Sequence, residues 1–522
     1  MKASHLILIF SCIALHPTFG EVRLPKIFSE NMMLQRDKPI RVWGWADAKE
    51  VVTVDLSGSN GSATTTPDGT WSVELPAKPA GENLVLSVEG TNRLTLKNII
   101  IGDIWICSGQ SNMEMPLKGC LGADKDTKTA NLPKIRRIKF TRTSSGWPEA
   151  DAPAARPWEV CSPETVSNFT AVGFYFARDI QEQTGVPIGI IDTNWGGTRI
   201  EPWVAPEGLE AVPELAAAST KRQKAMDHYH QQLPSELARM DQWLAKTKLE
   251  LSNGSSVTQP PTIPSPSTDG WSNLYYAMIH PIVKLPIKGA LWYQGESNGR
   301  EGLSYLHKMH ALIGGWRQQW NQGDFPFYFT QLASYENVNE DSAGAGWAYI
   351  REAQAKALSI PNTGMAVIID TVPLAETSDI HPRNKFDVGT RLARWALAHD
   401  YGKSIEVSGP KFKGLSIVSD KIHLTFDHVG AGLMVGKKQG RQPTTESDVE
   451  PLKQFAIAGS DQKWLPADAV IQDNKVIVSS PAVKEPVAVR YAFRMNPAGA
   501  NLYNREGLPA APFRTDDWKT TP

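Results

Sequence analysis

The sequence predicts an α/β protein built on a doubly wound, mainly parallel sheet that is flanked by N- and C-terminal β domains. Between residues 99 and 402, short apolar runs typical of buried strands alternate with longer segments of helical periodicity. Residues 21–98 and 403–522 instead contain short runs of alternating apolar and polar residues, separated by turn signals. This change of pattern, twice along the chain, predicts a central α/β core between two β-rich parts.

The first 20 residues resemble a secretory signal peptide. Lys2 precedes an apolar run at Leu6–Leu15, and Thr18–Gly20 offers small residues for cleavage. The run is too short to span a bilayer and no later stretch is long and apolar enough, so we expect no membrane insertion. The expectation is an exported protein, periplasmic or extracellular. The absence of a dense disulfide framework favours a bacterial source.

The two flanking parts have the pattern of antiparallel sheets. In residues 21–98, runs such as Arg41–Trp45 and Val51–Asp55 are separated by turn signals such as Pro67–Gly69, which predicts a small β-sandwich. Residues 403–522 show the same pattern of short alternating runs and turn signals, which predicts a second β-rich domain. Residues 21–98 carry no side chains that suggest chemistry of their own, and we expect them to serve in packing or sugar contact.

The stretch 99–113 organises the core. An apolar run ends in the small polar residues around Ser111, as at the carboxyl end of a buried parallel strand, where ligands of open α/β sheets bind. Met113 stands where the nucleophile elbow of α/β-hydrolases has glycine, so the motif is a different one. Taken alone, the stretch also fits a loop that only caps the next helix.

The remaining core is predicted in two parts, 99–205 and 270–402, separated by an insertion at 206–269. The insertion is polar, with two helical stretches on either side of Pro234 and then a loop rich in Ser, Thr and Pro. We expect it to lie over one face of the core, in the manner of a lid.

Composition limits the classes of function. Lys and Arg number 54 against 55 acidic residues, a net charge of −1, which argues against nucleic acid as a partner. Seventeen Trp residues weakly suggest carbohydrate contacts. Three cysteines follow the signal, Cys107, Cys120 and Cys161; a Cys120–Cys161 disulfide is one option that the sequence leaves open. No spacing of ligands predicts a metal site.

Four polar loops follow apolar strands, and such loops gather at one edge of a doubly wound sheet. Together they offer a hydroxyl nucleophile, an imidazole base, a carboxylate and amide donors for an oxyanion, the set that acyl transfer requires. Each loop alone has a structural explanation, as a turn, a helix cap or a buried polar pair. The loops hold Ser111, Gly196 and Gly197, Gln294, and Asp379 with His381.

Four motifs closely resemble the sialate O-acetylesterase family of carbohydrate esterases, which belongs to the SGNH-hydrolase superfamily. They are Gly109-Gln-Ser-Asn-Met113, Trp195-Gly-Gly-Thr198, Trp292-Tyr-Gln-Gly-Glu-Ser-Asn298 and Asp379-Ile-His-Pro382. The resemblance implies a flavodoxin-like three-layer αβα core and a serine esterase that removes O-acetyl groups from sugars. The expected reaction is hydrolysis of 9-O-acetylated sialic acid to sialic acid and acetate, with an O-acetylated sugar or glycan as substrate.

The resemblance also implies roles for the loop residues. Ser111 is the expected nucleophile and His381 the general base and then acid, with Asp379 orienting the imidazole. No metal or organic cofactor is implied.

Three groups are the expected oxyanion donors. They are the backbone N–H of Ser111, a backbone N–H at the Gly196–Gly197 turn and the side-chain amide of Gln294. Many SGNH enzymes have Asn at the position of Gln294, whereas the sialate O-acetylesterase branch usually has Gln there.

The pair Asp379-x-His381 departs from the Asp-x-x-His spacing common in SGNH enzymes. Asp370, at the end of the preceding predicted strand, is an alternative partner for His381, and a Ser–His dyad supported by a backbone carbonyl is another.

Two alternative functions stay open at this stage: an acetylxylan- or pectin-type polysaccharide deacetylase, and a non-catalytic carbohydrate-binding protein. Arg199, Glu201 and Trp203 line a sugar pocket in one interpretation and form a structural ion pair beside a core Trp in the other. The sequence does not fix the natural ester or the oligomeric state.

Overall fold

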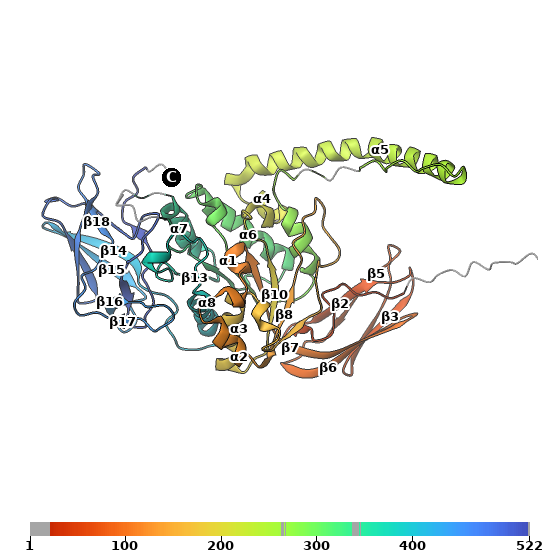
Figure 1. The fold of residues 1–522 in the computed structure, drawn as a ribbon, viewed down its shortest axis with the longest axis horizontal. Helices are drawn as coiled ribbons and strands as arrows, with labels where there is room; N and C mark the ends of the chain where they lie inside the picture. The colour runs from red at the N-terminus through yellow and green to blue at the C-terminus, as the bar shows by residue number, and fades with distance from the viewer. Residues whose placement is uncertain (1–20, 263–265, 267, 337–343, 345, 520–522) are drawn as a thin grey trace, which may run out of the picture.

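The computed structural model describes residues 21–519 except 263–265, 267, 337–343 and 345, so the predicted signal segment 1–20 lies outside the described residues. The chain forms an elongated molecule with the α/β core in the middle and β-sheets at both ends (Figure 1). No helix in the described ranges is long and apolar enough to cross a membrane.

The N-terminal part consists of short strands and one long strand. A two-stranded sheet, β2–β5, accompanies a larger sheet in which β3 pairs with β4 and β6, and β6 and β1 pair with β7. Strands alternate buried and exposed residues, as expected of sheets with one wet face. The strands are β1 (Met33–Gln35), β2 (Ile40–Trp45), β3 (Val51–Leu56), β4 (Ser59–Thr64), β5 (Thr70–Leu75), β6 (Gly81–Glu89) and β7 (Arg93–Gly109).

Strand β7 belongs to two parts of the molecule. The sequence predicts a strand from Ile99, but the strand begins at Arg93 and runs for 17 residues. Residues 93–102 pair with β6 and β1, and residues 103–109 pair with β10 (Ile188–Asn194) and β11 (Gly289–Tyr293). The same strand thus connects the N-terminal sheet to the core without an intervening linker.

The core sheet has the strand order β13-β12-β11-β7-β10-β8-β9, in which all neighbours are parallel except β9 at the edge. A mixed α/β fold with a large sheet is therefore present, as the sequence predicts. Its further strands are β8 (Leu132–Lys139), β9 (Glu159–Cys161), β12 (Phe327–Thr330) and β13 (Thr363–Ala366). Its helices are α1 (Ser111–Glu114), α2 (Ala123–Thr129), α3 (Ala171–Thr184), α4 (Pro206–Glu210), α6 (Ser304–Trp320), α7 (Trp347–Lys356) and α8 (Lys385–His399).

Both faces of this sheet are buried, which explains the nearly continuous apolar run in β7. Ile104 and Ile106 point into the core that Trp316 of α6 helps to fill. Trp105 and Cys107 point into the opposite core, where the Trp105 and Phe176 rings lie 4.9 Å apart against α3. The alternation of side chains along one strand thus serves two helical layers.

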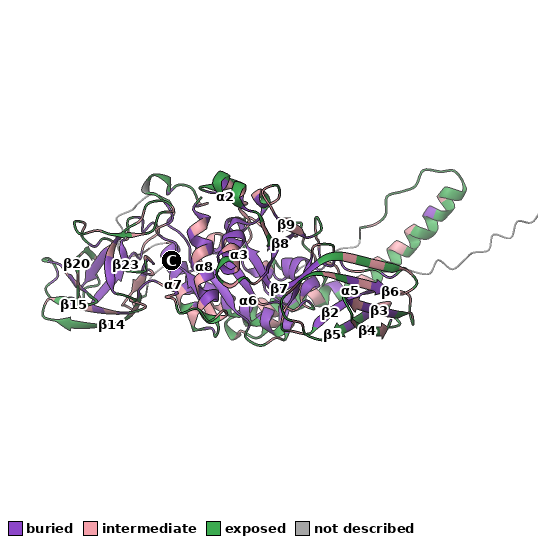
Figure 2. Cartoon of the chain, turned by 90° about the horizontal axis from the view of Figure 1, so that it is seen from below, coloured by how far each residue is buried: buried purple, intermediate pink, exposed green. Residues whose placement is uncertain are grey.

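The segment 206–269 departs from the sequence-based expectation. The two helical stretches expected on either side of Pro234 form one continuous helix, α5 (Ala216–Ser252), with the proline inside it. Figure 2 shows α5 projecting from the body as an exposed arm rather than lying over one face. Its sequence explains this, because most of its side chains are polar and few are buried: Arg222, Tyr229 and Thr247.

The C-terminal part contains three small antiparallel sheets, ordered β14-β15-β21-β20, β17-β16-β23 and β19-β18-β22-β24. Buried apolar residues such as Ile422, Val478 and Val489 fill the space between strands. The strands are β14 (Lys411–Val418), β15 (Lys421–Asp427), β16 (Leu433–Lys437), β17 (Thr445–Glu446), β18 (Phe455–Ala458), β19 (Leu465–Pro466), β20 (Asp468–Gln472), β21 (Lys475–Ser479), β22 (Ala488–Tyr491), β23 (Leu502–Asn504) and β24 (Phe513–Arg514).

Cys107, Cys120 and Cys161 are buried and free, so the Cys120–Cys161 disulfide that the sequence leaves open is not formed. Burial raises the pKa of the Cys120 thiol to about 11 and that of Cys161 to about 12. Both thiols are therefore protonated at neutral pH and act as small apolar side chains.

Candidate active site

Ser111 is placed by a sharp turn at the end of β7. Gly109 has φ of 132°, a conformation that side chains rarely adopt, and an added Cβ there would lie 2.1 Å from the Tyr293 carbonyl oxygen. The next residue, Gln110, donates its backbone N–H to the same carbonyl at 3.0 Å. The chain therefore leaves the sheet immediately after Gly109, and Ser111 begins α1 at the carboxyl edge of the parallel strands.

His381 lies against Ser111. The distance from His381 Nε2 to Ser111 Oγ is 2.9 Å, within hydrogen-bond range, although the residues are 270 positions apart. His381 belongs to the loop between β13 and α8, residues 367–384, which we call the base loop. This is the geometry that a nucleophile and its general base require.

Asp379 has a looser relation to the imidazole. Its Oδ1 accepts the backbone N–H of His381 at 2.8 Å and lies 3.6 Å from Nδ1, beyond hydrogen-bond distance. Both side chains are partly exposed, with 57% of the Asp379 side chain and 41% of the His381 side chain accessible. In this arrangement Asp379 shapes the backbone of the base loop and faces the ring without binding it.

Asp370, the alternative partner of His381, is engaged elsewhere. Its two carboxylate oxygens accept from the Arg391 guanidinium at 2.6 and 2.8 Å, and the Tyr503 hydroxyl donates to it at 3.1 Å. Burial opposes the charged form, yet the Arg391 cation keeps the pKa of Asp370 below its usual range. Asp370 thus joins the core to β23 of the C-terminal part.

The glycine turn after β10 packs directly against Ser111. A Cβ added at Gly196 would lie 3.2 Å from the Ser111 Cβ. The Gly196 N–H donates to Glu114 Oε2 at 2.8 Å, and Arg142 pairs with the other oxygen of that carboxylate. Gly197, with φ of 78°, donates its N–H to no acceptor within the described residues. At this turn, Gly197 therefore has the backbone donor that stays open to a ligand.

Gln294 is fully buried and connects several loops. Its amide nitrogen lies 3.2 Å from Gln110 Oε1, 3.3 Å from the Thr198 carbonyl and 2.7 Å from Asn298 Oδ1. The Tyr305 hydroxyl donates to its Oε1 at 2.7 Å. Because an amide has only two N–H bonds, a hydrogen bond from Gln294 to an oxyanion requires that one of these contacts be given up.

Arg199, Glu201 and Trp203 combine both interpretations that the sequence leaves open. Arg199 pairs with Glu201 at 2.9 Å and with Glu301, and Lys308 bridges the same two carboxylates at 2.6 Å each. Trp203 is buried, while half of the Arg199 side chain is exposed. The ion-pair network is structural, and its outermost member faces a hollow beside the site.

Sequence reasoning missed a buried polar cluster that begins at the residue after Ser111. The Asn112 amide donates to Glu296 Oε1 at 2.5 Å and to the Ile380 carbonyl at 3.0 Å, and it accepts from the Lys385 ammonium. Burial lowers the pKa of Lys385 to about 8 and raises that of Glu296. The only signal in the sequence was position, since Asn112 follows Ser111 and Lys385 begins the helix after the base loop.

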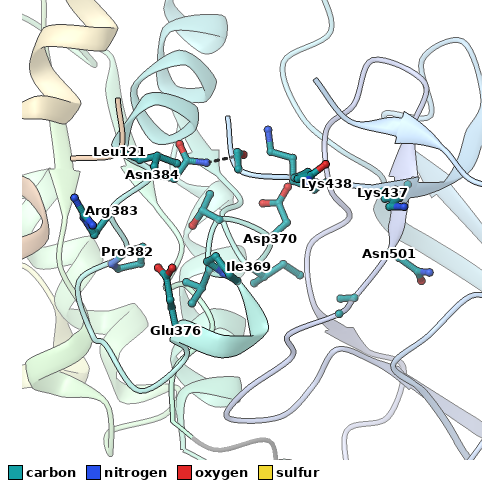
Figure 3. Close-up of a pocket in the computed structure, with 18 of the residues that line it drawn as sticks. Leu121, Ile369, Asp370, Glu376, Pro382, Arg383, Asn384, Lys437, Lys438 and Asn501 are labelled. Atoms are coloured by element: carbon teal, nitrogen blue, oxygen red, sulfur yellow. Dashed lines mark hydrogen bonds between the residues drawn. The ribbon is translucent and has the colours of Figure 1, made fainter. Parts of the chain in front are cut away.

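The base loop separates two hollows. Asp379 and His381 line a cavity of about 460 Å³ whose lining also includes Lys437, Lys438 and Asn501 of the C-terminal part (Figure 3). Ile380 lines the other, of about 510 Å³, together with other residues of the core. Each hollow is large enough to hold part of a sugar.

Comparisons with known proteins point to one family. A family model described as "Carbohydrate esterase, sialic acid-specific acetylesterase" matches residues 101–233 and 264–398. The sialate O-acetylesterase of Rattus norvegicus is 29% identical over 530 residues, covering 93% of each chain. That of Homo sapiens is 28% identical, covering 94% of this chain and 92% of the relative. The solved structure of a carbohydrate acetylesterase from Xanthomonas citri has a TM-score of 0.78 and 35% identity, covering 95% of this chain and all of that one.

Proposed function

Because this chain belongs to the carbohydrate esterase family of sialic acid-specific acetylesterases, we propose that its Ser111 site removes O-acetyl groups from sialic acid. The chain is a carboxylic ester hydrolase. The observation that carries the site assignment is the 2.9 Å approach of His381 Nε2 to Ser111 Oγ at the carboxyl end of β7.

The proposed reaction has two steps. Ser111 Oγ attacks the acetyl carbonyl carbon while His381 Nε2 takes the hydroxyl proton, and the sugar alcohol leaves with that proton. Water, deprotonated by His381, then attacks the acetyl-serine ester, which releases acetate and restores the serine hydroxyl. Asp379, facing Nδ1 at 3.6 Å, favours the imidazolium that forms in each step.

The negative oxygen of each tetrahedral intermediate needs donors that are already in place. We assign this role to the backbone N–H groups of Ser111 and Gly197, with Gln294 as the third donor. Ser111 begins α1 and Gly197 lies in the turn that packs on it, so both amides belong to segments in contact with the nucleophile. Three acceptors already surround the Gln294 amide. Because it is the side-chain donor of the three, its role can be tested directly by substitution.

The strand order supports a flavodoxin-like SGNH core. Numbered in chain order, the parallel strands β7, β8, β10, β11, β12 and β13 have the sheet order 2-3-1-4-5-6. When β8, which with β9 extends one edge, is left out, the remaining strands have the flavodoxin-like order 2-1-3-4-5. The order reverses between β7 and β11, the strands followed by Ser111 and Gln294. Ligands of doubly wound sheets bind at this reversal. Export to the periplasm or the cell exterior is part of the same proposal and rests on the signal-like residues 1–20.

The first test is acetate release from 9-O-acetylated sialic acid and from acetylated xylan in parallel. We expect release from the sialic acid, reduced about 10⁶-fold by Ser111→Ala because the nucleophile is lost. Asp379→Asn should reduce acetate release much less, since the Asp379 carboxylate does not bind the imidazole in the structure. Release mainly from xylan would show that the same mechanism acts on a polysaccharide instead of sialic acid. Acetate release by the Ser111→Ala variant would refute the site.

A further inference from the structure

The described part of the chain contains a second set of polar groups that meets at the nucleophile and has no assigned part in the reaction. Asn112 is 1% exposed and Lys385 is fully buried. Glu296 Oε2 and the Tyr293 hydroxyl are buried beside them without hydrogen-bond partners in the described residues. Burying polar groups without hydrogen-bond partners costs free energy, so a cluster that contains such groups calls for an explanation.

The contacts of Asn112 join three segments. Its amide nitrogen donates to the Ile380 carbonyl at 3.0 Å, which lies in the base loop between Asp379 and His381. It also donates to Glu296 Oε1, in the loop after β11. Its oxygen accepts from Lys385, the first residue of α8.

The Asn112–Ile380 contact lies next to the Ser111–His381 contact and joins the same two segments. Ser111 and His381 meet at 2.9 Å, and their chain neighbours Asn112 and Ile380 meet at 3.0 Å. Two neighbouring residues on one segment therefore bind two neighbouring residues on the other. The contact between Asn112 and the Ile380 carbonyl fixes the position and angle of the imidazole relative to the Ser111 hydroxyl. Small misplacements of reacting groups lower the reaction rate strongly.

Lys385 determines which way the Asn112 amide points. An ammonium can only donate, so it selects the amide oxygen, and the nitrogen must then face Ile380 and Glu296. Lys385 Nζ also lies 5.0 Å from the centre of the Tyr293 ring. The charged or titratable groups around it are Glu296 after β11, Asp379 in the base loop and Cys120 before α2.

We propose that Asn112 and Lys385 are positioning residues that hold the base loop against the nucleophile turn and thereby set the Ser111–His381 hydrogen bond. This inference rests on the proposed function, in which Ser111 attacks and His381 is the base. Neither residue touches substrate; both act through the Ile380 backbone.

The test compares Asn112→Ala and Lys385→Met with wild type, using 4-nitrophenyl acetate as a small ester and 9-O-acetylated sialic acid as the sugar ester. For both esters, kcat should fall about 10²-fold and KM should change less than about 3-fold, because alignment is lost while binding surfaces remain. The rate of Ser111 labelling by a phosphonate should fall in the same ratio. Lys385→Arg retains a cationic donor and should recover part of kcat.

Two controls separate structure from positioning. Val54→Ala removes buried volume from β3 in the N-terminal sheet and should lower stability without changing kcat. If Asn112→Ala does not fold, the difference in kcat between Lys385→Arg and Lys385→Met decides the question alone.

The pH profile is the second readout. Since the pKa of Lys385 is about 8, the wild-type rate should decline above that pH as the ammonium loses its charge, and Lys385→Met should lack this limb. Unchanged kcat in both variants, or an identical alkaline limb in Lys385→Met, overturns the positioning role. Ser111→Ala is measured alongside: activity that survives it refutes the proposed function, whereas loss only in Ser111→Ala refutes this inference alone.

Discussion

A single buried lysine links the chemistry of the site to its stability. Lys385 begins α8 with its whole side chain out of contact with water, and burial lowers its pKa to about 8. In the unfolded chain the same group titrates near 10.4. Between these two values the folded protein releases the proton that the unfolded chain keeps.

The sign of the resulting effect on stability follows from linkage. Because the unfolded state binds more protons between about pH 8 and pH 10.4, the free energy of unfolding contributed by Lys385 rises with pH in that window. Below about pH 8 the lysine is charged in both states and its full desolvation cost is present. The total change is up to about 3 kcal/mol.

We therefore expect the free energy of unfolding of wild type to rise relative to that of Lys385→Met as pH increases from 7.5 to 10. Urea denaturation at each pH measures this difference. Activity should move in the opposite direction over the same range if Lys385 orients Asn112. A stability difference that is constant with pH would show that the folded lysine keeps its proton over this range, as the unfolded chain does, so that its pKa is not lowered.

At the level of elements, the junction of β7 and α1 is the most constrained turn of the site. We expect Gly109→Ala to destabilise the protein severely, by more than about 4 kcal/mol, because its φ of 132° and the Tyr293 carbonyl both exclude a side chain. The measurement is the yield of folded protein and its thermal midpoint. Gly185→Ala is the matched control: Gly185 also has positive φ, at 73°, but no atom lies within 4 Å of an added Cβ. Equal effects of the two substitutions would show that backbone strain, not the clash, is decisive.

Elements with strong periodicity could be predicted from the sequence. Helix α8 (Lys385–His399) is an element of this kind, because its apolar positions repeat at helical spacing and Asn384 caps it. The pairing of β7 with strands of two different parts could not be predicted, since periodicity does not reveal strand partners. Pro234 was misleading because α5 tolerates a proline on an exposed face, where the carbonyl left without a donor can bind water.

The same distinction holds for the candidate site. Ser111 and His381 could be proposed because their residue types carry the chemistry and their loops follow strands. The Asn112–Lys385–Glu296 cluster could not, since these residue types are common and their contacts span 184 and 273 positions. Only the folded chain brings such groups together.

At the scale of the whole molecule, one buried arginine joins the core to the C-terminal part. Arg351 of α7 is fully buried and donates to the Leu332 carbonyl at 2.8 Å in the core. Across the interface it donates to the carbonyls of Arg494 at 2.9 Å and Met495 at 3.1 Å. Burial lowers its pKa to about 9, so at neutral pH it remains a cation held by carbonyl oxygens.

Arg351→Met should therefore lower the free energy of unfolding by at least about 3 kcal/mol, because each hydrogen bond to a charged group contributes about 1.5–3 kcal/mol. Lys356→Ala, on the same helix, removes only the half-exposed lysine from an ion pair, and Glu352 keeps its hydrogen bonds from Arg514, so the substitution should cost less than about 1 kcal/mol. Thermal denaturation of both variants measures the difference. Similar midpoints would mean that the two parts are held together mainly by other contacts.

The shared strand β7 also has a mechanical consequence. A hydrogen-bonded strand is stiff along its length, so the N-terminal sheet and the core cannot hinge about a loop between them. Force applied to the N-terminal sheet would be carried along residues 93–109 and would arrive at the turn that holds Ser111. If an immobilised or surface-attached form of the protein were pulled at its N-terminal end, the load would reach Ser111 before it reached the C-terminal strands.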